Sequence, residues 1–323
     1  MTRGETVGTV TTPEPPRERP PAPVLSDRAR AERRLGWWLA GPAFVVMLLV
    51  TAYPILQATY DSLFRYRLTD PDNREFIGLN NYLVVLGDSV WWKAVGVTVL
   101  ITVVTVVLEL VLGFALALVM HRALTTLRPI LRTAILIPYA IITVVSAIAW
   151  QYAFDINSGF FNSWFGWLPG IDDSTNVFGS FGSSIAVICA SEIWKTTPFI
   201  SLLLLAGLAQ VPEDLQEAAK VDGATWWQRM YKVTIPNMKA AIMVALLFRT
   251  LDAFRIFDNV FIMTQGANGT EVVSLLAYRS TISRLEIGLG SAISVLLFLC
   301  VVLISFGFIK LFKVDLASAR GEG

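Results

Sequence analysis

The sequence is poor in charged residues, which make up 16% of its 323 residues, whereas hydrophobic residues make up 54%. A soluble domain carries about 25% charged residues, and a chain this apolar has too few polar side chains to cover its surface in water. The stretches 94–108 and 287–309 contain no charge at all, as membrane spans do. These observations exclude an ordinary soluble enzyme, and a net charge of +1 without a basic cluster excludes a nucleic-acid-binding protein.

Cysteine and histidine are also scarce. Both cysteines, Cys189 and Cys300, lie within apolar runs, so a disulfide framework is not expected. The single histidine, His121, has no second histidine or nearby cysteine for a metal site, and no partner for a Ser/His or Cys/His catalytic arrangement. No G-x-x-x-x-G-K-[ST] phosphate loop occurs, so the chain itself is expected to hold neither ATP nor any other cofactor. These absences argue against an intramembrane enzyme.

Six long apolar segments predict an all-α integral membrane fold. The segments are continuous rather than alternating, and only helices or closed barrels satisfy the backbone hydrogen bonds in lipid. Pro54, Pro138 and Pro198 lie within spans and should bend them. The Pro- and Arg-rich stretch 1–35 is expected to be a disordered tail, and 314–323 a second tail, with the membrane domain at 36–313. The predicted spans are 36–60, 94–120, 133–153, 184–208, 240–263 and 288–311.

The distribution of Lys and Arg predicts the orientation. Seventeen of them lie in the N-terminal tail, the loops 121–132 and 209–239 and the C-terminal end, against six in the other three connections. Because cytoplasmic connections carry the excess of Lys and Arg, both termini are predicted to be cytoplasmic in a multi-pass protein of the cytoplasmic membrane. Trp37, Trp38, Trp91 and Trp92 are interpreted as interface anchors.

The loop 209–239 is the most informative stretch, and it is predicted to form two short helices. Pro212 suits the first turn of a helix, and Gly223 supplies the turn that ends it. Thr225 and Gln228 fit a capping box that opens the second helix. The first helix presents the small residues Ala218 and Ala219, which would let its backbone lie deep in a groove of another protein.

This loop resembles the EAA signature of permease subunits in binding-protein-dependent ABC importers. The matching residues are Glu217, Ala218 and Ala219, then Asp222 and Gly223, and finally Pro236. The resemblance extends over about 36–313 and includes the stretches 76–82, 194–198 and 249–258, which are similar to the carbohydrate-uptake branch with its maltose and glycerol-phosphate permeases. One departure is that the maltose permease has extra N-terminal spans and a large external domain, which this chain lacks.

The resemblance implies the fold of a type I ABC importer permease, in which this loop is the coupling helix that docks onto a cytoplasmic ATPase. The implied partners are a second permease subunit, a pair of ATPase subunits that bind ATP and Mg, and an external sugar-binding lipoprotein. The implied cargo is a sugar, first of all a disaccharide such as trehalose, with other disaccharides and glycerol-phosphate derivatives open. A second permease of different sequence is expected, although a homodimer is also open.

Several ionisable residues are expected at membrane depth, where each must face a partner or a water-filled cavity. Glu192 and Lys195 share a helix face, Arg249, Asp252 and Arg255 form a stripe of alternating sign, and Glu109 needs a partner on another helix. One interpretation is a polar path for sugar hydroxyls, and the other is a set of ion pairs between the fourth and fifth spans. The candidate path residues are Glu192, Trp194, Lys195, Asp252, Phe254, Arg255, Phe257 and Asn259, with the aromatic rings as platforms for sugar faces.

Two questions stay open at this point. The external loop 154–183 has no Lys or Arg but carries five aromatic residues between Phe160 and Trp167, which favours either a surface for the binding protein or a segment on the membrane interface. An ion- or proton-coupled transporter that works without an ATPase is the alternative function. It would use the intramembrane carboxylates as a relay, but it leaves the two-helix loop at 209–239 unexplained.

Overall fold

The computed structural model describes residues 27–123, 126–167 and 175–312. The chain divides into two compact units, residues 1–54 and 55–323. Helix α1 (Asp27–Asp61) contains Pro42 and Pro54, and its part from Arg34 onward is long and apolar enough to cross a membrane. It begins inside the predicted tail because the Ala, Arg and Glu residues there are strong helix formers. The remaining tail predictions, for 1–26 and 314–323, lie outside the described residues.

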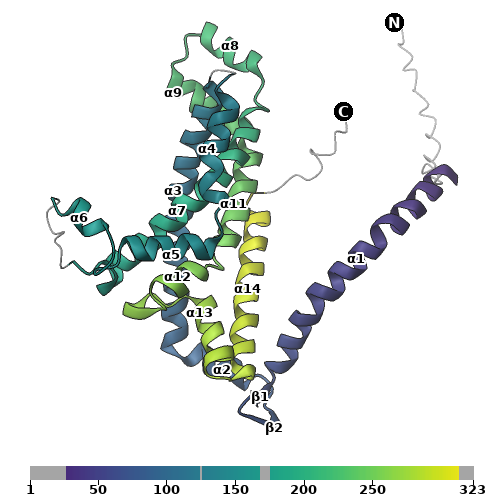
Figure 1. Ribbon diagram of the computed structural model, residues 1–323. Helices are drawn as coiled ribbons and strands as arrows, with labels where there is room; N and C mark the ends of the chain where they lie inside the picture. Colours follow the sequence, from purple (N-terminus) through teal and green to yellow (C-terminus); the bar gives the residue numbers. More distant parts are fainter. Residues whose placement is uncertain (1–26, 124–125, 168–174, 313–323) are drawn as a thin grey trace, which may run out of the picture. The chain divides into compact units, whose positions relative to one another are not determined.

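Three long helices dominate the second unit: α3 (Ser89–Arg122), α7 (Phe181–Leu208) and α14 (Ile287–Phe312) (Figure 1). Small residues let neighbouring helices approach closely, as is usual in membranes. A Cβ atom on Gly113 of α3 would lie 2.7 Å from the Ile200 side chain of α7. One on Gly207 would lie 2.5 Å from the Cβ atom of Ala241, in α11 (Lys239–Ala253). Helices α3, α7 and α11 therefore form one tightly packed layer.

Two of the predicted spans are broken helices. The segment 133–153 forms α4 (Arg128–Ala140) and α5 (Thr143–Ala153), which meet at 83° just after Pro138. The segment 240–263 forms α11 and α12 (Asp258–Met263), separated by the turn 254–257. In the described part of the chain, four single helices are long and apolar enough to span a membrane, and the bent pair α4–α5 makes a fifth. The count of six spans therefore stays a prediction.

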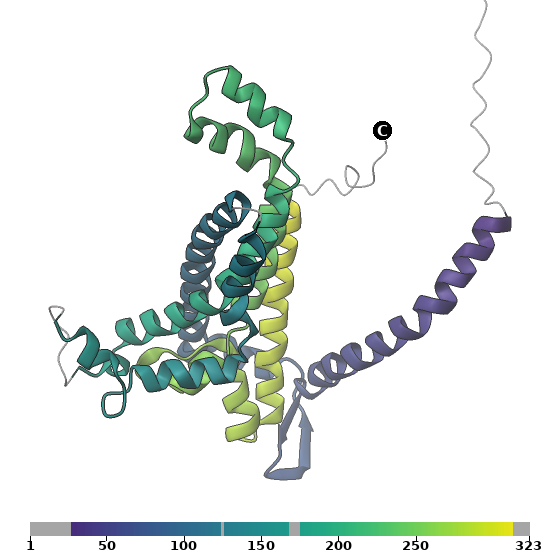
Figure 2. The ribbon, with the colours of Figure 1, turned by 45° about the horizontal axis from the view of Figure 1, so that its top comes forward.

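The two short arms, α5 and α12, lie side by side across the longer helices (Figure 2). The amide of Gln151 in α5 donates to the Ile262 carbonyl of α12 at 2.8 Å. Buried residues from four helices, namely Ile101 of α3, Ala147 of α5, Ile188 of α7 and Val260 of α12, form one hydrophobic cluster. These contacts hold α5 and α12, the second halves of the two broken helices, against each other and against α3 and α7.

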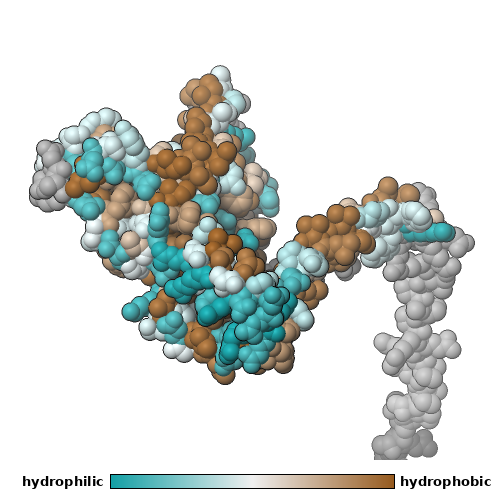
Figure 3. Space-filling model, turned by 60° about the horizontal axis from the view of Figure 1, so that its bottom comes forward, coloured by the Kyte–Doolittle hydropathy of each residue, from teal (hydrophilic) through white to brown (hydrophobic). Residues whose placement is uncertain are grey.

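One end of the second unit carries a β-hairpin that the sequence did not predict. Strands β1 (Phe64–Arg67) and β2 (Asp70–Phe76) pair antiparallel, and α2 (Asn80–Gly87) follows. The amide of Asn81 in α2 donates to the carbonyls of Ser62 and Phe64 at 2.7 and 2.9 Å. Figure 3 turns this end toward the viewer and shows hydrophilic surface gathered there, in keeping with the fully exposed β2.

The hairpin is fastened to the start of α14. The Leu68 amide donates to the Leu285 carbonyl at 2.8 Å, and Arg67 forms an ion pair with Glu286 at 2.7 Å. Gly288 lies so close to the hairpin that a Cβ atom there would stand 2.1 Å from the Phe64 carbonyl oxygen. Trp91 is buried between α2, α13 and α14 rather than anchored at an interface, because Trp91 and Trp92 point to different sides of α3.

The opposite end carries the two-helix loop (Figure 1). Its elements are α8 (Glu213–Val221), α9 (Trp226–Arg229), a π-helical turn η2 (Met230–Thr234) and α10 (Ile235–Asn237). The remaining short elements are α6 (Phe161–Phe165), η1 (Val177–Gly179), η3 (Ala267–Gly269), α13 (Val273–Tyr278) and η4 (Arg279–Ser283).

Candidate functional site: a polar pocket and an exposed loop

A pocket of about 570 Å³ opens where the two helix breaks meet the middle of α7. The break between α4 and α5 contributes 139–143, and the break between α11 and α12 contributes 255–258. In a membrane, backbone outside regular helices is tolerated only where it is buried in protein or lines a water-filled cavity. The two breaks satisfy that condition by facing the same pocket. Residues of both breaks and polar side chains of α7 therefore line one pocket between the apolar helices.

An ion-pair network built on Arg249 forms the wall behind this pocket. Arg249 is only 1% exposed, and its guanidinium forms a two-point contact with Glu109 of α3, the second bond measuring 2.9 Å. The same group reaches Glu192 of α7 at 2.9 Å and Asp252 of its own helix at 2.7 Å. Thr196 donates a further hydrogen bond to Glu109 at 2.7 Å. Each buried charge of this network is therefore paired, as burial at membrane depth requires.

The network gives Glu109 the partner on another helix that the sequence analysis required. It also joins α7 to α11, the fourth and fifth predicted spans, as the structural interpretation of these charges predicted, and it adds α3 to them. Asp252 belongs both to the ion-pair network and to the pocket lining. Its carboxylate binds Arg249, and its side chain is 64% exposed and lines the pocket. The ion-pair network and the polar wall of the pocket therefore share Asp252.

The structure brings six of the eight predicted path residues to the pocket. Glu192 accepts a 2.5 Å hydrogen bond from Asn259, which is almost fully buried. Lys195 lies with its ammonium 5.5 Å from the centre of the Tyr139 ring, a cation–π contact. The six that line the pocket are Glu192, Lys195, Asp252, Arg255, Phe257 and Asn259.

Trp194 and Phe254, the other two predicted path residues, lie elsewhere. Trp194 is two positions from Glu192 and one from Lys195, and residues at those spacings do not face the same side of a helix. It lines a separate apolar groove together with Pro138 of α4. Phe254 is buried at the end of α11, only 5% exposed. The aromatic groups at the pocket are instead Phe257 and Tyr139, and the break after Pro138 was the signal for Tyr139.

The loop at the other end exposes the residues of the predicted coupling motif. No residue of α8 is buried, and Glu217, Ala218, Asp222, Gly223 and Pro236 are exposed while Ala219 is half-buried. The apolar side chains of Leu215 and Val221 are also exposed, Val221 by 88%. An amphipathic helix whose apolar residues stay in solvent is typical of a docking element for another protein.

The local structure of this loop follows the sequence prediction closely. Gly223 ends α8 with φ = 76°, a left-handed conformation that favours glycine, and the Ala224 amide donates back to the Ala219 carbonyl at 2.9 Å. The predicted capping box is present: the Gln228 amide donates to the Thr225 hydroxyl, and the Gln228 side chain accepts from the Thr225 amide at 2.7 Å. The turn between α8 and α9 is therefore fixed at both sides.

The aromatic stretch in the connection 154–183 contains one half-buried residue, Phe161, and four exposed residues. Phe161 packs on Phe154 at 4.3 Å between ring centres and contacts the hydrophobic cluster of α3, α5, α7 and α12. Trp164 and Trp167 are exposed by 67% and 77%. Part of the stretch thus holds α6 in place, and part remains available to a partner or to lipid, as both earlier interpretations allow.

A model of the family of binding-protein-dependent transport system inner membrane components matches residues 109–314. The match covers the ion-pair network, the pocket and the exposed loop. The chain belongs to this family and is an inner membrane component of a transport system, not an enzyme. The resemblance stated from the EAA signature is thereby confirmed.

Curated relatives agree with this assignment. The chain is 52% identical over 299 residues to the trehalose transport system permease protein SugA of Mycobacterium tuberculosis, which covers 90% of this chain and 92% of that protein. It is 38% identical over 281 residues to the trehalose/maltose transport system permease protein MalF of Thermococcus litoralis, covering 86% of this chain and 94% of that protein. Both relatives are permease subunits of sugar transport systems.

Among solved structures, the fold matches a bacterial ABC transporter involved in the import of the acidic polysaccharide alginate. The TM-score is 0.75 at 19% identity, and the match covers 90% of this chain and 100% of that one. A second structure of that system holds an alginate pentasaccharide-bound periplasmic protein. The fold of an ABC importer permease predicted from the sequence is therefore confirmed.

Proposed function

We propose that this chain is the membrane-spanning permease subunit of an ATP-driven importer for a disaccharide such as trehalose. The sugar would pass from an external binding lipoprotein, through the pocket between the helix breaks, to the cytoplasm. The observation that carries the proposal is the pocket of about 570 Å³ at the level of the two breaks. Its volume lies within the range of about 300–1,000 Å³ that small-molecule sites occupy.

The chemistry of the pocket supports a neutral cargo rich in hydroxyl groups. Lys195 and Arg255 offer donors and Asp252 offers acceptors, so hydroxyls can donate and accept at the same wall. Phe257 and Tyr139 add aromatic faces for the apolar side of a sugar ring. Charges of both signs alternate along the wall, which disfavours trapping an ion. The identity to the trehalose permease named above supports trehalose as the first cargo to test.

The exposed loop supports a separate energy source. Helix α8 offers Ala218, Leu215 and Val221 to a partner surface, and we infer that this partner is the ATPase that binds ATP and Mg. The excess of Lys and Arg on this side supports placing the loop and both termini in the cytoplasm. A second permease subunit, of a different sequence, would complete the path. In this mechanism, closure of the ATPase pair moves α8 and, through η2 and α10, the broken helix α11.

The test is purification of the chain with its bound partners from native membranes, followed by an ATPase assay in lipid vesicles. We expect an ATPase and an external binding protein to copurify, and trehalose to stimulate ATP hydrolysis when the binding protein is present. Sugar uptake by the chain alone, driven by a proton gradient and abolished by a protonophore while ATP is maintained, would refute the proposal. That result would favour the ion- or proton-coupled alternative.

A further inference from the structure

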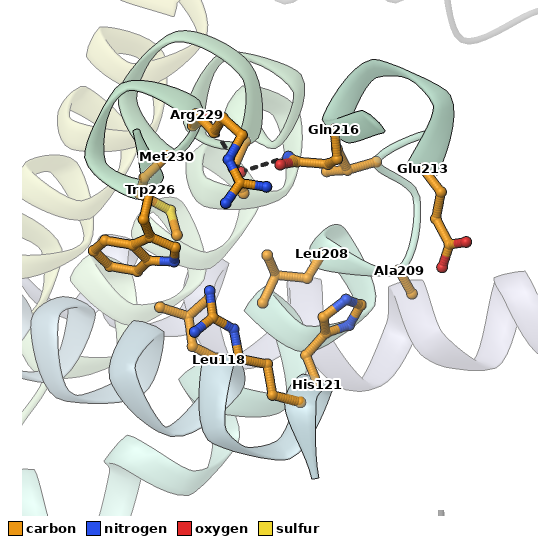
Figure 4. Close-up of a pocket in the computed structure, with 12 residues that line it drawn as sticks. Leu118, His121, Leu208, Ala209, Glu213, Gln216, Trp226, Arg229 and Met230 are labelled. Carbon is orange, nitrogen blue, oxygen red and sulfur yellow. Dashed lines mark hydrogen bonds between the residues drawn. The ribbon is translucent and has the colours of Figure 1, made fainter. Parts of the chain in front are cut away.

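A second pocket, of about 350 Å³, lies between the two-helix loop and the ends of α3 and α7 (Figure 4). Its floor is apolar and includes Leu118 of α3 and Leu208 of α7. Its upper wall comes from the loop and carries Trp226, Arg229 and Met230. This pocket is separate from the polar pocket at the helix breaks, and none of the residues assigned to the sugar path lines it.

Two buried donors in this pocket have no acceptor. The indole N–H of Trp226 and the Nε–H of Arg229 are both buried, and neither forms a hydrogen bond within the part of the chain that the structure describes. The neighbouring polar groups are already engaged, since Gln216 donates to the Thr234 hydroxyl at 2.9 Å. A buried donor without a partner is costly, and both groups here can only donate. A group that binds here would therefore satisfy both donors if it supplied acceptor oxygens.

The charge around the two donors specifies an anion. The guanidinium of Arg122, the last residue of α3, lies 5.4 Å from the centre of the Trp226 ring, and both Arg122 and Arg229 line the pocket. Glu213 is the one carboxylate lining the pocket among the described residues, and it lies at the opposite end from Trp226 (Figure 4). Arginine forks match the oxygen geometry of phosphate groups particularly well.

We propose that this pocket binds a phosphate group beneath the two-helix loop, carried by an anionic phospholipid or free in solution. The apolar floor favours the lipid, because Leu118 and Leu208 belong to long apolar helices and would contact the glycerol and acyl region. The exposed residues Trp227 of α9 and Tyr231 of η2 follow Trp226 in the loop, and aromatic residues of this kind gather at headgroup depth. Basic pockets at the ends of membrane helices on the cytoplasmic side hold lipid headgroups elsewhere.

A bound phosphate would connect the loop to the transmembrane helices. Arg229 belongs to the loop and Arg122 to α3, so one anion would bridge the loop, which the proposed transport mechanism moves, and the end of α3. The binding itself does not depend on the cargo or on ATP. A failure to bind phosphate would therefore refute this proposal without refuting the proposed transport function.

The experiment measures binding to the full-length chain in neutral detergent by native mass spectrometry, with dioleoylphosphatidylglycerol against dioleoylphosphatidylcholine, and by calorimetry with inorganic phosphate. We expect one phosphatidylglycerol to be retained, and Arg229→Gln or Arg122→Gln to weaken its binding about tenfold each, the effect of one lost charge-assisted hydrogen bond. Trp226→Phe keeps the ring and removes only the N–H, so it should weaken binding without affecting the fold. Lys232→Gln is the matched control, because Lys232 is an exposed cation of η2 that does not line the pocket.

Retention of phosphatidylglycerol without binding of inorganic phosphate supports the lipid as the source. Binding of inorganic phosphate alone, with the same dependence on Arg229 and Trp226, supports the phosphate site with a soluble ligand. Equal retention of both lipids, or an equal loss of binding in Lys232→Gln and Arg229→Gln, overturns the proposal, because the attraction would then come from general charge. Retention that is unchanged in Trp226→Phe and in both arginine variants overturns it as well.

Discussion

Replacement of Arg249 by methionine is the sharpest test of the ion-pair network. Arg249 is only 1% exposed and binds three carboxylates, those of Glu109, Glu192 and Asp252. Methionine fills a similar space without the charge, so Glu109, which is fully buried, loses its only cation among the described residues. Removal of one partner from a buried ion pair costs about 3–5 kcal/mol, because the other charge stays buried and unpaired. We expect a loss of that size in the free energy of unfolding.

The assay is reversible unfolding of the purified chain in mixed micelles, followed by circular dichroism. Arg255→Met is the control, since Arg255 lies in the break after α11 on the pocket side, is exposed and donates only to the Leu251 carbonyl in the described contacts, at 3.3 Å. The double variant Glu109→Gln/Arg249→Met should recover about 1 kcal/mol or more, since both charges are gone. If Arg249→Met is no less stable than Arg255→Met, the network does not stabilise the fold and the reasoning fails.

Three further predictions concern the loop, the pocket and the hairpin. Gly223→Val places a β-branched residue at φ = 76°, which costs about 1–2 kcal/mol of local conformational free energy. We expect the assembled transporter with this variant to hydrolyse ATP but to take up less sugar, with both activities measured in vesicles. Asp252→Ala and Arg255→Ala should each raise the KM for sugar uptake, by on the order of tenfold, through loss of a charged hydrogen-bond partner. Gly288→Ala should destabilise the chain by about 1–3 kcal/mol in chemical unfolding, because its Cβ atom would meet the Phe64 carbonyl oxygen at 2.1 Å.

Two of these predictions have a control variant within the chain, and the prediction for the pocket has an outcome that refutes it. Gly223→Asn should transport almost normally, because asparagine tolerates the left-handed conformation, and tight coupling in Gly223→Val would contradict the role of the turn. Gly307→Ala in α14 meets nothing within 4 Å, so it should not reduce stability as Gly288→Ala does. Normal affinity and rate in both Asp252→Ala and Arg255→Ala would remove these residues from the path.

The sequence predicted the long helices and the turn chemistry well, because both are determined by neighbouring residues. The uncharged runs located α3 and α14 to within a few residues. Thr225, Gln228 and Gly223 predicted the capping box and the turn, since each acts on backbone groups within a few positions of itself.

The breaks and pairings over long distances could not be predicted in the same way. Hydropathy does not distinguish a continuous helix at 240–263 from one that unwinds at 254–257, because the unwound residues are as apolar as their neighbours. Glu109 clearly needed a partner, but Arg249 is 140 positions away and only the packing of α3 on α11 brings them together. The misplacement of Trp194, in contrast, was avoidable, since helical spacing alone puts it on the other side of α7 from Glu192.

The fastening of the β-hairpin to the start of α14 has a consequence for biogenesis. Arg67 and Glu286 are 219 positions apart, and a ribosome that adds about 5–20 residues per second needs on the order of 10–45 s to make the intervening chain. During that time the hairpin has emerged while its anchor has not been synthesised. The nascent protein therefore completes this end last, and α14 closes a structure whose other edge was synthesised first.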